Sequence, residues 1–465
     1  MENFSDYSVW GTYLIIGALL TSLLVANIVK NKTPFLKNSL IPTSVLGGVI
    51  LLLIAGIYRA ITGDVFFELA IFGKNGFATL ETLTYHALAL GFIASTLKTT
   101  NTKLTKERSV EIFNTGVTTV ATYLIQGALG LAVTIISALV VTDLLAGSGI
   151  LLAFGFGQGT GQAMNYGNIF EMENGFVGGK SFGLTIAAAG FLCASLGGVI
   201  HLNILKHRGK LKKSEATEEI IDPEQIQGHD EIPMQESIDK ITVQIALIAF
   251  AYVLAYVIMA VLGNLLPSMS SVIYGFNFLI GVLTATLLKC VINFLRKKKI
   301  MKKEHINNFL LTRISNFFFD LMVVAGIAAI RLDMLEKYWG IILILSAVGF
   351  VITYVYNRFV AKVLFKKYSE EQFLMMYGML TGTACTGTIL LRELDGDFKT
   401  PASDNMVYQN FPAIVFGFPL MFLATLAPDK PVLVMIICFL AFGVMNLILF
   451  RKFIFKRKKK EKQSE

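Results

Sequence analysis

Charged residues are scarce in this sequence. Asp, Glu, Lys and Arg make up 16% of its 465 residues, whereas soluble domains carry about 25%. Apolar residues make up 54%, and they occur in blocks of roughly 18–28 residues, long enough to cross a bilayer as helices. The sequence therefore predicts an all-α polytopic membrane protein and argues against a soluble globular domain.

Residues that build metal centres and catalytic sites are also few. The four cysteines lie in apolar segments, at spacings that suit neither a metal site nor a disulfide framework. The five histidines are scattered along the chain, without an HExxH or similar pair. We therefore expect no enzyme activity and no bound cofactor.

The net charge of +9 raises the question of a nucleic-acid partner. The basic residues, however, stand in short clusters at the ends of apolar segments, such as Arg296–Lys299 and Arg457–Lys460. This placement is typical of the cytoplasmic loops of membrane proteins. We expect contact with membrane lipid and no nucleic-acid partner.

Eleven apolar segments are predicted to span the membrane. They are 11–29, 39–58, 81–97, 112–141, 177–204, 240–265, 272–295, 314–330, 339–357, 406–427 and 431–450. The polar segment 205–239 divides the chain, and its two prolines and mixed charges predict a flexible cytoplasmic linker.

Two segments rich in glycine and polar residues interrupt this pattern, at 155–171 and 378–405. Unpaired backbone in hydrocarbon costs several kcal/mol per group, so neither segment is expected to face lipid. If each enters and leaves the membrane on one side, 34 of the 41 Lys and Arg residues fall on the inner side. The positive-inside rule therefore favours two re-entrant hairpins, about 147–172 and 373–395.

The hairpins divide the spans into two similar runs of five. Residues 1–204 form the first predicted repeat and 240–427 the second, and five is odd, so the second repeat is inverted in the membrane. Residues 428–465 add an eleventh helix and a basic cytoplasmic tail, and the N-terminus is placed outside. Inverted repeats with broken elements are typical of secondary transporters.

The first hairpin offers neutral donors and acceptors that suit a small polar substrate. The predicted substrate-binding residues are Gln158, Gly159, Thr160, Gln162 and Asn165, and Asn168 is a candidate sodium ligand. A glycine-rich packing turn between helices is the alternative.

The second hairpin adds hydroxyl groups and charge. Its candidates for substrate binding are Thr383, Thr386, Thr388 and Arg392, because a guanidinium matches a carboxylate in two hydrogen bonds. The alternative for Arg392 is an ordinary positive-inside residue. Asp404 and Asn405 are predicted either to bind sodium or to cap the next helix. Asp320, inside a span, is a further sodium candidate.

Three motifs resemble the sodium:glutamate symporter family. They are Ile41-Pro-Thr-Ser-Val-Leu-Gly-Gly48, Gly157-Gln-Gly-Thr-Gly161, and Ser181-Phe-Gly-Leu-Thr185 with Gly197-Gly198. The resemblance implies sodium-coupled glutamate uptake, inverted repeats with two hairpins, and a dimeric scaffold beside a mobile core. Typical members carry histidine at the position of Gln158, and Gly382–Gly387 lacks the proline common in their second hairpin.

We therefore predict a secondary transporter of the cell membrane that takes up glutamate or a similar small anion with sodium as the coupling ion. The hairpins, rich in neutral oxygens and without histidine, favour sodium over protons. A homodimer is expected from the resemblance. The alternatives are a sodium-coupled di- or tricarboxylate carrier of the citrate type and an ion channel, although channels usually repeat one pore element around an axis.

Overall fold

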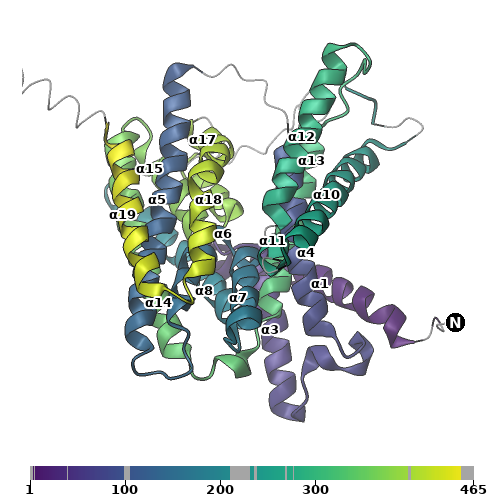
Figure 1. Ribbon diagram of the computed structural model, residues 1–465, viewed down its shortest axis with the longest axis vertical. Helices are drawn as coiled ribbons and strands as arrows, with labels where there is room; N and C mark the ends of the chain where they lie inside the picture. The colour runs from purple at the N-terminus through teal and green to yellow at the C-terminus, as the bar shows by residue number, and fades with distance from the viewer. Residues whose placement is uncertain are drawn as a thin grey trace, which may run out of the picture. The chain divides into compact units, whose positions relative to one another are not determined.

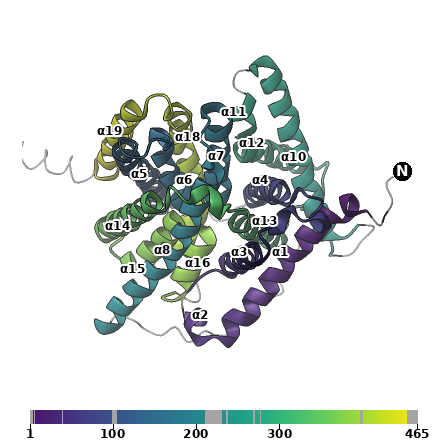
Figure 2. The same ribbon diagram turned by 90° about the horizontal axis from the view of Figure 1, so that it is seen from below.

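The computed structural model describes the chain except residues 1–3, 5, 39, 99–104, 210–230, 235–237, 268–269, 276, 396–399 and 452–465. The described part is helical and contains no strand; one isolated bridge pairs Glu231 with Glu304. Figures 1 and 2 show the helices in two views.

Ten helices of the described chain are long and apolar enough to cross a membrane. They are α1 (Tyr7–Lys32), α3 (Thr43–Thr62), α4 (Gly76–Leu97), α5 (Lys106–Ser137), α8 (Gly179–His207), α10 (Lys240–Leu265), α12 (Asn277–Lys297), α13 (Asn308–Ala328), α14 (Trp339–Leu364) and α19 (Pro431–Leu449). The prediction of a helical, multi-pass membrane protein is confirmed.

The tenth predicted span, 406–427, forms two helices instead of one. They are α17 (Ala402–Tyr408) and α18 (Asn410–Leu426), bent by 51° at the break between them. Pro412 lies in the first turn of α18, where a residue without an N–H group is tolerated. The local sequence therefore favours a new helix at this point.

The shorter helices connect or interrupt the spans. They are α2 (Pro34–Asn38), α6 (Leu151–Gln158), α7 (Thr160–Asn174), α11 (Ser270–Gly275), α15 (Ser369–Thr381), α16 (Ala384–Arg392) and the 3₁₀ turns η1 (Phe66–Glu68), η2 (Ala70–Phe72), η3 (Ala146–Ile150) and η5 (Leu332–Leu335).

The predicted linker 205–239 lies mostly outside the described residues. Its first residues continue α8 to His207. Its end is anchored, because the fully buried Lys240 donates to Glu231 Oε2 at 2.6 Å and Asn307 Nδ2 donates to the same oxygen at 2.7 Å.

The helices form two compact units, each drawn from both halves of the chain. Unit 1 comprises Met1–Ala26, Leu46–Lys103 and Thr217–Ala329, and unit 2 comprises Asn27–Val45, Leu104–Ala216 and Ile330–Glu465. Within unit 1, α4 packs against α12 and α13, and α10 packs against α12 (Figure 1). Within unit 2, α5 packs against α14, α18 and α19, and α8 packs against α6, α7, α14 and α15 (Figure 2).

Unit 1 has a continuous apolar core with its polar groups paired. Ile93, Leu97, Ile248 and Ala285 are buried together in that core. Asn277, fully buried, donates to Tyr85 O at 3.0 Å. Such pairing is the ordinary solution for polar groups that leave water.

Candidate functional site

The first predicted hairpin is a helix broken at one glycine. α6 ends at Gln158 and α7 begins at Thr160, and Gly159 between them has φ 82° and ψ −170°. This backbone conformation is essentially restricted to glycine. Beyond the break the chain folds back, because the rings of Phe154 and Tyr166 stack with centroids 4.1 Å apart.

The second predicted hairpin is also interrupted by a short break, but its glycine, Gly382, has φ −143° and ψ −104° and so lies outside the left-handed region. α15 ends at Thr381 and α16 begins at Ala384. A Cβ added to Gly378 would lie 2.8 Å from the Cα of Gly387, so these two helices also fold back and touch through their backbones. Small residues allow this close approach between helices in a membrane.

Glycines of α8 allow both broken helices to pack closely against α8. A Cβ on Gly183 would lie 2.3 Å from Ala163 O in α7, and a Cβ on Gly190 would lie 2.4 Å from Thr381 O at the end of α15. The same Cβ on Gly190 would lie 3.2 Å from Phe156 of α6. The two breaks therefore share α8 as a common support within unit 2.

Helix α5 contacts the carbonyl ends of both broken helices. The hydroxyl of Tyr123 donates to Gly157 O at 3.0 Å, in the last turn of α6. Gln126 Nε2 donates to Leu380 O at 2.9 Å, in the last turn of α15, and to Thr353 Oγ1 of α14 at 2.7 Å. The last carbonyls of a helix have no partner within it, and these side chains supply one.

Gln126 was missed by the sequence analysis. The signal that could have found it is a polar stripe inside the apolar segment 112–141, where Thr115, Thr119, Thr122 and Gln126 recur at spacings of four, three and four. This spacing places them on one helix face. All four are fully buried.

Several buried polar atoms at the breaks have no hydrogen-bond partner among the described residues. They are Gln126 Oε1, both amide atoms of Gln162, and Thr386 Oγ1. Gln162 lies in the first turn of α7 and Thr386 in the first turn of α16. A buried polar group left unpaired costs about 1–3 kcal/mol, so these atoms are available to coordinate an ion or a polar solute.

The predicted substrate residues are not all equally close to the breaks. Thr160, Gln162, Asn165 and Thr386 are buried in the opening turns of α7 and α16, and Gly159 is buried at the first break. Gln158, Thr383 and Thr388 are partly exposed, and Thr388 Oγ1 donates to Ala384 O at 2.9 Å.

Arg392 is exposed at the far end of α16. At 1.5 Å per residue, it lies about 12 Å along the helix from the break. This position favours the alternative of a positive-inside residue over direct contact with a substrate at the break.

The four sodium candidates also differ in their burial and in the unit to which they belong. Asn168 is exposed on α7, and Asp320 belongs to α13 of unit 1, so the site within unit 2 does not include it. Asp404 is 60% exposed, and its Oδ2 lies 3.5 Å from Arg108 Nη2. Asn405 is fully buried.

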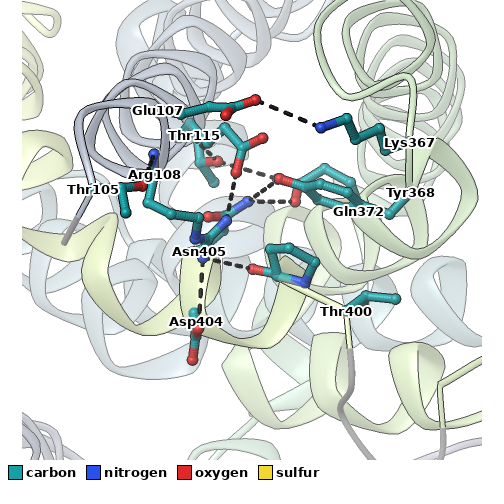
Figure 3. A network of polar contacts seen from close by, with 12 residues as sticks. Thr105, Glu107, Arg108, Thr115, Lys367, Tyr368, Gln372, Thr400, Asp404 and Asn405 are labelled. Atoms are coloured by element: carbon teal, nitrogen blue, oxygen red, sulfur yellow. Dashed lines mark hydrogen bonds and ion pairs between the residues drawn. The ribbon is translucent and has the colours of Figure 1, made fainter. Parts of the chain in front are cut away.

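Asn405 lies in a polar network between α5, α15 and α17 (Figure 3). Its Nδ2 donates to Tyr368 OH and to Gln372 Oε1, both at 3.0 Å, and Gln372 Nε2 donates to Thr115 Oγ1 at 3.2 Å. Asn405 Oδ1 has no hydrogen-bond partner among the described residues. The capping alternative for Asp404 and Asn405 is wrong, because α17 already begins at Ala402 and neither α17 nor α18 has a side-chain cap.

An ionic cluster anchors the start of α15. Glu370 accepts from His201 Nε2 at 2.9 Å and from Arg358 Nη2 at 2.6 Å, and Tyr354 OH lies 2.9 Å from His201 Nδ1. Burial raises the pKa of Glu370. The hydrogen bonds from His201 and Arg358 have the opposite and larger combined effect, and they lower the pKa to about 2. Glu370 is therefore ionised at neutral pH and fixes α15 against α8 and α14.

No group of three or more His, Cys, Asp or Glu side chains in the described chain is placed to hold a metal ion. Unit 2 does contain neutral oxygens near the breaks and in the polar network, on Gln126, Asn405 and the backbone carbonyls of the helix ends. Such oxygens are the ligands that half-helix ends and unwound backbone supply in transporters.

A comparison with models of protein families finds a match. The family model described as sodium/glutamate symporter matches residues 10–371. A search of the curated proteins finds no match. The matched region includes α6, Gly159 and α7 and ends in the first turn of α15, so the second break, α16 and Asn405 lie beyond it.

Proposed function

The chain belongs to the sodium/glutamate symporter family, and on that premise we propose that it imports glutamate or a similar small carboxylate or amino acid. Membership makes it a sodium-coupled transporter rather than an enzyme. The proposal concerns the substrate, the binding site and the way in which the site is exposed to each side.

The pair of broken helices in unit 2 is the observation that supports this function. At each break the carbonyl end of one helix meets the N–H end of the next. Helix C-termini carry partial negative charge and favour cations, whereas N-termini favour anions. Two breaks on a common support therefore suit a sodium ion together with a substrate that carries a carboxylate.

We place the substrate carboxylate at the N-terminal turns of α7 and α16. Gln162 and Thr386 would contribute unpaired polar atoms, and Thr160, Asn165 and Thr383 lie in or next to the same turns. Among the four sodium candidates, Asn405 is the strongest, because its Oδ1 is buried and unpaired by a described residue.

Inverted repeats are part of the proposal. The breaks at Gly159 and Gly382 are 223 residues apart, and Gln126 donates to Thr353, which follows it by 227 residues. Each unit also takes corresponding segments from both halves of the chain. These features support two repeats of five spans with re-entrant hairpins. The distribution of Lys and Arg supports an N-terminus outside and a cytoplasmic C-terminus.

Unit 2 would be the substrate-binding core of an alternating-access carrier, and unit 1 the scaffold of a homodimer. Unit 2 contains the breaks and the unpaired polar atoms, whereas the helices α4, α10, α12 and α13 of unit 1 are continuous. The two-break construction also favours a carrier over a channel, which usually repeats one pore element.

Transport by purified protein in liposomes tests the function. An inward sodium gradient should drive labelled glutamate above its equilibrium level, and uptake that is indifferent to sodium would contradict the coupling. Sodium-driven uptake of labelled citrate without uptake of labelled glutamate would favour the citrate-type alternative. Saturable counterflow of substrate would identify a carrier and exclude a channel.

A further inference from the structure

The end of α12 and the loop after it line an open cavity of about 640 Å³. This volume lies in the range of about 300–1,000 Å³ that small-molecule sites occupy. The cavity is lined by Asn293, Arg296, Lys297, Lys299, Met301 and Lys302. Four of these six side chains are cationic, and all belong to unit 1.

The positive charge around the cavity is only partly balanced. Arg296 is paired with Glu304. Lys297, Lys299 and Lys302 are exposed and form no ion pair with a described residue. A concave surface lined by charge of one sign concentrates the field and attracts ions of the other sign. The cavity therefore favours an anion.

The loop that carries Lys299 and Lys302 is held at both ends. At its start, Lys298 N donates to Phe294 O at 3.0 Å. At its end, Asn307 N donates to Gln244 Oε1 at 3.1 Å, and Gln244 Nε2 donates to His305 O at 2.7 Å. Lys299 has φ 59°, a left-handed conformation uncommon for residues other than glycine. The backbone that carries these lysines is thus held beside the cavity, and their side chains are exposed.

An exposed apolar stripe runs along α12 to the cavity. Leu283, Leu287, Val291 and Phe294 are 45–60% exposed, and their spacing places them on one face of the helix. From Leu283 to Phe294 the stripe is about 16 Å long. That is close to half of the roughly 30 Å hydrocarbon core, or one leaflet.

We propose that the cavity binds the phosphate headgroup of an anionic phospholipid whose acyl chain lies along the exposed face of α12. Inorganic phosphate shares the headgroup chemistry but has no apolar part to cover the stripe. Basic clusters at the ends of membrane helices attract anionic lipids in this way. The proposal is independent of the transport site, which lies in unit 2.

Lipid retention by the full-length protein tests the proposal. Native mass spectrometry would count bound phosphatidylglycerol after exchange from mixed micelles that also contain phosphatidylcholine. Combining Lys297→Gln, Lys299→Gln and Lys302→Gln should lower the preference for phosphatidylglycerol by about tenfold or more. The matched control combines Lys362→Gln, Lys366→Gln and Lys367→Gln, which removes the same charge from the last turn of α14 and the turn after it and should change the preference by less than about twofold.

Two further measurements distinguish lipid binding from a folding defect of the variants and from binding of free phosphate. In the unmodified protein, phosphatidylglycerol with a photoreactive headgroup should crosslink to residues 293–302; crosslinks confined to other segments would overturn the proposal. Inorganic phosphate at millimolar concentration should fail to displace the lipid. Displacement by phosphate, or equal retention in the two triple variants, would also overturn it.

Discussion

Unit 1 and unit 2 differ in the hydrogen bonding of their buried polar side chains. Among the described residues, the buried side-chain atoms without a hydrogen-bond partner lie in unit 2, on residues that include Gln126, Gln162, Thr386 and Asn405, and none lies in unit 1. In unit 1 a fully buried amide such as that of Asn277 is hydrogen-bonded to backbone. The difference supports the proposal that unit 1 is the stable scaffold and that unit 2 binds the ion and the solute through these polar atoms.

The largest expected effect follows from the break at Gly159. Replacement Gly159→Ala forces a side chain into a glycine-only conformation, with a strain of about 1–3 kcal/mol. Since each 1.4 kcal/mol is a factor of ten, sodium-driven uptake in liposomes should fall by about 10- to 100-fold. Gly63→Ala is the control, because Gly63 in unit 1 also has positive φ, at 79°, with open space around it. Equal losses of uptake in both variants would contradict the comparison.

Gln126 and Asn277 provide a matched pair of buried amides, one in each unit. Each replacement by Ala leaves backbone carbonyls unpaired and should destabilise the protein by about 1–3 kcal/mol. Gln126→Ala should also raise the sodium concentration for half-maximal uptake by about tenfold. This corresponds to a loss of about 1.4 kcal/mol of sodium-binding free energy, because the ligands at the break are displaced. Asn277→Ala should leave that concentration unchanged. The checks are melting temperature and sodium titration of uptake, and the same sodium shift in both variants would refute a special role for Gln126.

Asn405 and Asp404 are neighbours with opposite environments. Asn405→Ala should raise the half-maximal sodium concentration by about tenfold, because it removes a buried oxygen that we propose as a sodium ligand. Asp404→Ala removes an exposed ion pair of small energetic value and should change the sodium response by less than about twofold. Sodium titration of transport compares the two, and a larger shift in Asp404→Ala would reverse the assignment.

Arg392→Ala should have the smallest effect. The side chain is exposed about 12 Å from the break, so the substrate KM should change by less than about threefold. An increase near a hundredfold, close to the 3 kcal/mol of a charge-assisted hydrogen bond, would return Arg392 to the substrate site.

The sequence could predict the features that depend on local composition. The apolar blocks predicted the spans, and the glycine-rich segment around Gly159 predicted an interruption at the first break. The bend between α17 and α18 was missed within a single apolar segment, although Pro412 marks it. The faces of Asp404 and Asn405 could not be assigned, because adjacent residues on a helix point about 100° apart and only packing decides which is buried.

The role of Gln126 could not be predicted for a different physical reason. Its partner carbonyl belongs to Leu380, 254 residues away, and contacts of that range depend on how helices assemble. Each unit contains segments from both halves of the chain, and this arrangement also depends on how the helices pack together. Local periodicity contains no information about either.

Hydrogen–deuterium exchange with and without sodium and glutamate tests most directly whether the unpaired atoms of unit 2 form the binding site. Sodium with glutamate should slow exchange of backbone amides in residues 157–163 and 380–388, while exchange in α12 and α13 of unit 1 stays the same. Protection confined to unit 1, or ligand-independent exchange at both breaks, would contradict the account.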